Sequence, residues 1–68
     1  MYIVTKYGNR MFDMKTCECH KDKNKDIGHI YINDMELASY PYKRAFNIYT
    51  DIIDALRNNE KIFELPAM

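Results

Sequence analysis

The chain has 68 residues, which allows one small domain, residues 1–68, and its 47% of hydrophobic residues exclude an intrinsically disordered segment. Ten basic and ten acidic residues balance, so the overall charge does not favour nucleic acid as a partner. No apolar run approaches the roughly 18 residues of a membrane span. The N-terminus also lacks the pattern of a secretory signal, and two cysteines cannot form a disulfide framework. We therefore expect a cytoplasmic, reduced protein.

The first part of the sequence is typical of β-strands. Residue types and alternation predict strands at residues 1–7, 10–20, 27–32 and 35–40. Gly8-Asn9 marks a turn after the first of them, and residues 21–26 form a charged loop. Asn33-Asp34 suits a tight hairpin, because both residues tolerate positive φ. The facing of residues 10–20 stays undecided, since neither side of that strand is clearly apolar.

A helix follows from about Tyr42 to Asn58, where the hydrophobic period changes to steps of three and four. Its apolar face is expected to contain Ala45, Ile48, Tyr49, Ile52 and Leu56. Pro41 suits the helix entrance, and Asn58-Asn59 can end the helix with a left-handed residue. A short strand at 61–65 comes last, before Pro66.

This order of elements predicts an α+β fold: a small antiparallel sheet of about four strands, with one helix packed on a face and a short C-terminal strand. The helix would cover one face of the sheet and leave the other open. An open face that carries tyrosine and methionine favours a dimer, a higher oligomer or a bound partner.

The sequence Cys17-Glu18-Cys19-His20, followed by His29, suggests a metal site. Zinc sites usually use cysteines two to four residues apart, whereas C-x-C on a strand places both sulfurs on one face and His20 on the other. A tetrahedral site from Cys17, Cys19, His20 and His29 would need a break in the strand near residue 20. We favour the alternative that both cysteines are small apolar strand residues, and we expect no cofactor.

No catalytic machinery stands out. The spacing identifies no nucleophile with a base and an orienting acid, and the carboxylates are scattered rather than paired. Two glycines are too few for a glycine-rich phosphate loop. The C-x-C pair also lacks the helix-start setting that lowers a thiol pKa. We therefore expect no enzymatic activity.

Two basic segments could contact an anionic partner. The lysines of residues 21–26 alternate with aspartates, which favours a solvated loop. In residues 40–44, YPYKR, two rings and two basic side chains at a helix start could bind an anionic group. The structural alternative, which we favour, places Tyr40 in the core and Lys43 and Arg44 on the wet face of the helix. Tyrosines are also good interface residues. The candidate ligand- or partner-binding residues are Arg10, Tyr31, Tyr40, Tyr42, Lys43 and Arg44.

An apolar pattern covers residues 28–66 and ends at a proline. Its positions are Leu37, Tyr40, Ala45, Ile53, Ala55, Phe63, Leu65 and Pro66. In these positions the chain resembles small uncharacterised proteins of Gram-positive bacteria and their phages. It departs from them at the helix start, with Tyr42 where that group has a hydroxyl cap and Arg44 where it has Glu. The resemblance implies a compact strand-rich unit with one helix, set in the accessory genome of bacteria and phages. It carries over no catalytic residue.

These features together predict a non-enzymatic binding protein that acts as a homo-oligomer. In its most concrete form, implied by the resemblance and the small size, it is a phage or mobile-element accessory protein that inhibits a host defence protein or sequesters a nucleotide signal. Two alternatives stay open. One is a small metal-binding module that uses the four cysteine and histidine residues, and the other is a nucleic-acid-binding regulatory protein that uses the lysine loop and residues 40–44.

Overall fold

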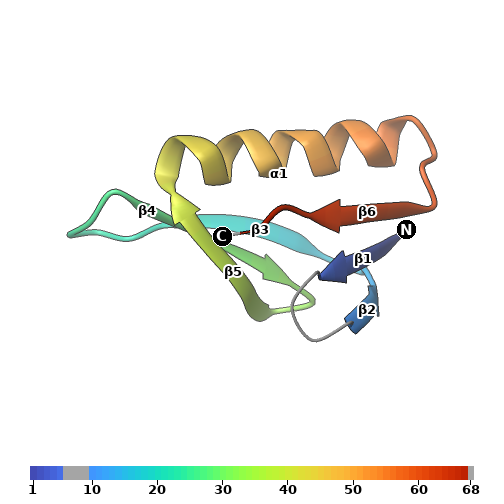
Figure 1. Cartoon of the computed structure of the whole chain (residues 1–68), viewed down its shortest axis with the longest axis horizontal. Helices are drawn as coiled ribbons and strands as arrows, with labels where there is room; N and C mark the ends of the chain where they lie inside the picture. Colours follow the sequence, from blue (N-terminus) through green and yellow to red (C-terminus); the bar gives the residue numbers. More distant parts are fainter. Residues whose placement is uncertain (6–9, 68) are drawn as a thin grey trace.

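The computed structural model describes residues 1–5 and 10–67, which form six strands and one helix (Figure 1). The predicted α+β class is confirmed. The predicted turn at Gly8-Asn9 lies outside the described residues. The elements are β1 (Tyr2–Thr5), β2 (Arg10–Asp13), β3 (Cys17–Lys21), β4 (Ile27–Ile32), β5 (Met35–Pro41), α1 (Tyr42–Arg57) and β6 (Ile62–Leu65).

The strands of the described residues form two three-stranded sheets. In the sheet of order β2-β1-β6, here called the terminal sheet, β1 is antiparallel to β2 and parallel to β6. In the sheet of order β3-β4-β5, here called the hairpin sheet, both pairs are antiparallel. After α1 the chain turns, and β6 runs back beneath the helix to lie beside β1 (Figure 1).

The single strand predicted over residues 10–20 is wrong. The chain divides there into β2 and β3, which belong to different sheets, and Met14 between them is buried in the core. The side chain of Asn33 stabilises this break. Its Oδ1 accepts hydrogen bonds from the backbone N–H groups of Lys15 (2.6 Å) and Thr16 (3.2 Å), and its Nδ2 donates to the Asp13 carbonyl (3.0 Å). A distant amide thus satisfies backbone groups that strand pairing leaves without partners.

The two local turn predictions are confirmed. Asn33 and Asp34 connect β4 to β5 with φ of 53° and 65°, as a tight hairpin of this kind requires. The helix ends at Arg57, Asn58 caps it, and Asn59 follows with φ of 57°. The Asn59 N–H donates to the Leu56 carbonyl (3.1 Å) and the Glu60 N–H to the Ala55 carbonyl (3.0 Å), which is the Schellman pattern.

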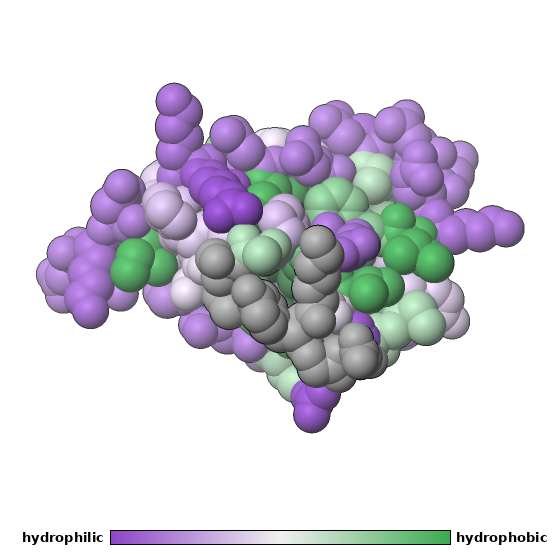
Figure 2. Space-filling model, viewed as in Figure 1, coloured by the Kyte–Doolittle hydropathy of each residue, from purple (hydrophilic) through white to green (hydrophobic). Residues whose placement is uncertain are grey.

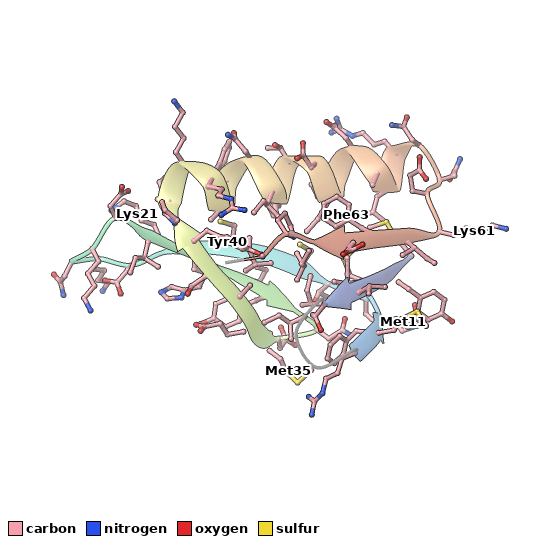
Figure 3. All side chains as sticks on the ribbon, in the orientation of Figure 1. Met11, Lys21, Met35, Tyr40, Lys61 and Phe63 are labelled. Carbon is pink, nitrogen blue, oxygen red and sulfur yellow. The ribbon has the colours of Figure 1, made fainter. Side chains whose placement is uncertain are left out.

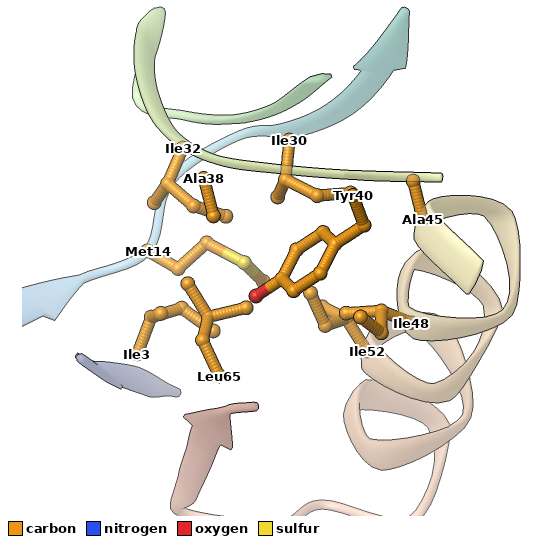
Figure 4. Packing of buried hydrophobic residues seen from close by; sticks show 10 residues of the cluster. All are labelled: Ile3, Met14, Ile30, Ile32, Ala38, Tyr40, Ala45, Ile48, Ile52 and Leu65. Carbon is orange, nitrogen blue, oxygen red and sulfur yellow. The ribbon is translucent and has the colours of Figure 1, made fainter. Parts of the chain in front are cut away.

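The core lies between three walls, formed by α1 and by one face of each sheet (Figure 4). Its buried members are Ile3, Met14, Ile30, Ile32, Ala38, Tyr40, Ala45, Ile48, Ile52 and Leu65. Of the predicted helix face, Ala45, Ile48 and Ile52 are buried, whereas Leu56 is 40% exposed. The buried side of the helix turns toward Ala55 instead.

The helix covers the face of β4 that contains Gly28, Ile30 and Ile32. Gly28 permits the close approach, because a Cβ at this position would lie 2.6 Å from the Cβ of Ala45. The residues that alternate with these, Ile27, His29 and Tyr31, therefore lie on the open face of the hairpin sheet.

Candidate functional site

The structure places the cysteines and histidines of the sequence on opposite faces of the hairpin sheet. In the register of β3 and β4, Cys19 pairs with Ile30 on the side of the helix, whereas His20 pairs with His29 on the open side. β3 continues through Lys21 without the break that a site shared by these residues would need. Within residues 1–5 and 10–67, no group of three or more metal-ligating side chains is arranged to hold an ion.

The two thiols pack against the core rather than facing solvent freely. Burial raises the pKa of Cys17 to about 11, and the neighbouring Cys19 and Glu18 add to the rise. Burial also raises the pKa of Cys19. Both thiols are therefore harder to ionise than an ordinary cysteine, and a protonated thiol is a poor nucleophile. This setting agrees with the interpretation of the cysteines as small apolar strand residues.

The open face of the hairpin sheet carries imidazoles and carboxylates in contact. His20 Nε2 lies 3.1 Å from Glu18 Oε1, and the rings of His20 and Tyr31 meet edge to face at 5.1 Å. His29 Nδ1 is buried and lies 3.1 Å from Glu36 Oε1, in the geometry of an ion pair rather than of a well-directed hydrogen bond.

A shallow hollow of about 690 Å³ opens over this face. It is lined by Glu18, His20, Lys21, Asp22, Lys23, His29, Tyr31 and Asp34. Within this hollow, His29 Nε2 lies 3.8 Å from Asp22 Oδ2. Because lysines and carboxylates line the hollow together, its charge favours neither an anion nor a cation.

Tyr40 and Arg44, two of the candidate binding residues, contact the end of the chain instead. Tyr40 is buried, and its hydroxyl donates to the Pro66 carbonyl at 2.8 Å. The Arg44 guanidinium lies over the Tyr40 ring, 5.1 Å from its centroid, and donates from Nη2 to the Ala67 carbonyl at 2.9 Å. The core position inferred for Tyr40 is confirmed. Both side chains hold the C-terminal residues against the hairpin sheet.

The remaining candidate residues are dispersed. Tyr42 is half-buried, with the Lys21 ammonium 5.7 Å from its ring centroid, and it begins an aromatic row along α1 that continues through Phe46 and Tyr49. Lys43 is exposed on the helix. Tyr31 lies on the open face of the hairpin sheet and Arg10 at an edge of the terminal sheet. The structure therefore does not bring the six candidates into one site.

A surface that the sequence reading missed lies on the outer side of the terminal sheet. There Tyr2, Met11 and Ile62 are 46%, 59% and 57% exposed, with the half-buried Val4 among them. The register places Tyr2 beside Ile62 and Val4 beside Met11 on one face, and it places Asp13 beside Tyr2 and Glu64 beside Val4 on the same face. We call Tyr2, Val4, Met11 and Ile62 the outer patch. Figure 2 shows hydrophobic side chains gathered over β1 and β6 at this end of the molecule.

The outer patch continues into a groove at the end of the helix. The groove has a volume of about 340 Å³ and is lined by Met1, Tyr2, Leu56, Asn59, Glu60 and Lys61. Met11 and Lys61 lie at this end of the molecule, on either side of β1 (Figure 3). Alternation in residues 1–5 and 61–65 is a signal for exposed apolar side chains. Only the pairing of β1 with β6 shows that they belong to one face.

Comparison with known proteins found no matching family model, no matching curated protein and no matching solved structure. Within the part of the chain that the structure describes, no helix is long and apolar enough to cross a membrane.

Proposed function

We propose that this protein is a small, non-enzymatic cytoplasmic binding protein that works as a homo-oligomer, most simply a dimer. The observation that carries the proposal is the outer patch. It places three large apolar side chains, each about half exposed, on one sheet face that no other described element covers, with Asp13 and Glu64 at the two remaining corners of that face. Exposed apolar side chains gathered on an uncovered sheet face support an interaction site there.

The energy available supports a moderate affinity. Full burial of a large apolar side chain contributes about 1.5–3 kcal/mol, so half-exposed side chains contribute roughly half of that. Two copies of the outer patch thus provide several kcal/mol, against which the loss of translational and rotational freedom must be set. We expect a dissociation constant between about micromolar and millimolar. The balanced charge of the chain adds no net repulsion between copies.

We propose that the oligomer is the form that binds a further partner. The resemblance of residues 28–66 to small phage-associated proteins suggests a host protein, for example a defence protein, in that role. A nucleotide signal is less well supported, because Tyr40 and Arg44, two of the candidate ligand-binding residues, already contact the carbonyl groups of Pro66 and Ala67. The aromatic row of α1 and the open face of the hairpin sheet would stay accessible in the proposed dimer.

Sedimentation equilibrium over a range from micromolar to near-millimolar protein tests the self-association. We expect the mass to rise from that of a monomer to that of a dimer. Ile62→Lys should hold the protein in the monomeric form, because the ammonium would have to be buried in the interface. Phe46→Lys is a matched control, since Phe46 is similarly exposed, at 48%, but lies on the helix. A folded wild-type protein that stays monomeric throughout this range would overturn the proposal.

A further inference from the structure

Charged residues lie at both edges of the outer patch, and their positions restrict how two copies can pack against each other. β2 and β6 are the two edges of the terminal sheet, with β1 between them. Asp13 at the end of β2 pairs with Tyr2, and Ile62 at the start of β6 pairs with the same residue. Asp13 lies on the outer face itself, Lys15 follows the end of β2, and Glu60 and Lys61 precede the start of β6.

We infer that two copies of this chain bind face to face about a two-fold axis that runs along β1, so that β2 of each copy lies over β6 of the other. This inference rests on the self-association proposed above. A two-fold axis makes the interface self-complementary, because each contact occurs twice. In this arrangement Asp13 lies over Ile62 of the partner copy, next to its Lys61, and Glu64 lies over Met11 of the partner copy, next to its Arg10. The Lys15 ammonium faces Glu60 of the partner copy.

The area of the patch favours this axis over a two-fold axis across the strands. With the usual spacings, a face of three four-residue strands measures about 14 by 14 Å, roughly 200 Å². A standard interface covers about 800 Å² per partner, so a dimer must also cover the groove at Leu56. An axis along β1 places the end of β2 over that groove in both copies. An axis across the strands would bring the Thr5 end of one sheet over the Tyr2 end of the other. The groove of each copy would then extend past the edge of the partner copy and stay uncovered.

The side chains at the rim are accessible for such pairing. The Asp13 side chain is 52% exposed and lies 3.1 Å from the Lys15 ammonium, and Lys61 is also exposed. An exposed pair of this kind contributes little within one chain, so its members can exchange partners at low cost. Tyr2 and Val4 of the two copies would then form the centre of the interface, and the charges on β2 and β6 would lie at its rim, as in most protein interfaces.

Charge reversal tests the arrangement by sedimentation equilibrium or by native mass spectrometry. Asp13→Lys alone and Lys61→Asp alone should each weaken the dimer roughly tenfold, because each places like charges together at two symmetric contacts. An equimolar mixture of the two variants should form heterodimers at wild-type affinity, since both contacts then join opposite charges. Lys43→Asp and Asp54→Lys, exposed on the helix, are the matched controls and should change nothing.

The outcomes separate this inference from the proposed function. A wild-type dimer whose mixture of variants shows no recovery, or whose single variants show no weakening, overturns the axis along β1 while self-association stands. If a mixture of the Asp13→Lys and Arg10→Asp variants instead forms heterodimers at wild-type affinity, the axis runs across the strands. A wild-type protein that is monomeric overturns the proposed function, and the inference with it. Thermal unfolding of each variant confirms that the reversals leave the monomer folded.

Discussion

Asn33 has two functions in the fold at a single position. Its backbone adopts the left-handed conformation that the β4–β5 turn needs, while its side chain makes three hydrogen bonds to residues 13–16. The same residue therefore closes the hairpin sheet and fixes the place where the chain passes from β2 to β3. The turn alone would not require asparagine, because glycine would serve it as well, whereas the three hydrogen bonds need an amide that both accepts and donates.

Replacement of Asn33 separates the two functions. Asn33→Gly keeps the backbone conformation but removes the amide, and we expect the free energy of unfolding to fall by about 1–3 kcal/mol. Asn33→Ala should cost about 1 kcal/mol more, because alanine must also adopt a positive φ. Urea unfolding measures both effects. A glycine variant as stable as the wild type would show that the hydrogen bonds to residues 13–16 do not contribute.

Cys17 should make the stability of the protein depend on alkaline pH. Its pKa is raised to about 11 from an ordinary 9.0, so the folded state keeps a proton that the unfolded state loses as the pH rises above 9.0. The free energy of unfolding should therefore decline from about pH 9 upward. Urea unfolding at about pH 8 and about pH 10 should show a larger loss for the wild type than for Cys17→Ala. Tyr40, whose pKa burial also raises, is present in both proteins and does not affect the comparison. Equal losses would contradict this role of Cys17.

At the scale of elements, the seating of α1 on the hairpin sheet depends on a small residue in each. Gly28 of β4 and Ala45 of α1 meet so closely that a Cβ on the glycine would also lie 3.1 Å from Cδ1 of Tyr42. The aromatic row that begins with Tyr42 is positioned by the same contact. The orientation of the helix thus depends on the missing side chain at Gly28 as well as on the buried side chains of β4.

Gly28→Ala should destabilise the protein by about 1–3 kcal/mol, because the helix must move away from the sheet. Ala45→Gly should itself cost about 1 kcal/mol, because glycine is a poor helix former. The double variant should recover part of the sum of the two losses, since it removes the clash. Thermal or urea unfolding of the four proteins checks this. Strictly additive losses would mean that the two residues do not press on each other.

At the scale of the whole molecule, some faces of the elements pack into the core, and others stay exposed to solvent. The core uses one face of each sheet and one side of the helix, and the C-terminal residues are held by Tyr40 and Arg44. The outer patch and the open face of the hairpin sheet lie away from this core. The first is apolar and the second carries charges of both signs, so they suit different partners. The predicted loss of dimer in Ile62→Lys therefore belongs to this scale, because it changes no contact of the core.

The sequence alone determined the elements whose signals are local. The hairpin of residues 27–40 follows from alternation around Asn33-Asp34, and the helix and its end at Asn59 follow from the apolar period and the left-handed tolerance of asparagine. These signals act within a few residues and do not depend on the rest of the chain. The α+β class follows from their order.

Only the tertiary structure decided how these elements meet. The division of residues 10–20 depends on an amide that lies 17 to 20 positions away in the sequence. The outer patch exists because β6 pairs with β1 from the opposite end of the chain. Tyr40 and Arg44 bind the carbonyl groups of Pro66 and Ala67, which lie 26 and 23 positions away in the sequence. In each case the deciding contact joins distant segments, and no pattern within one segment records which partner it will meet.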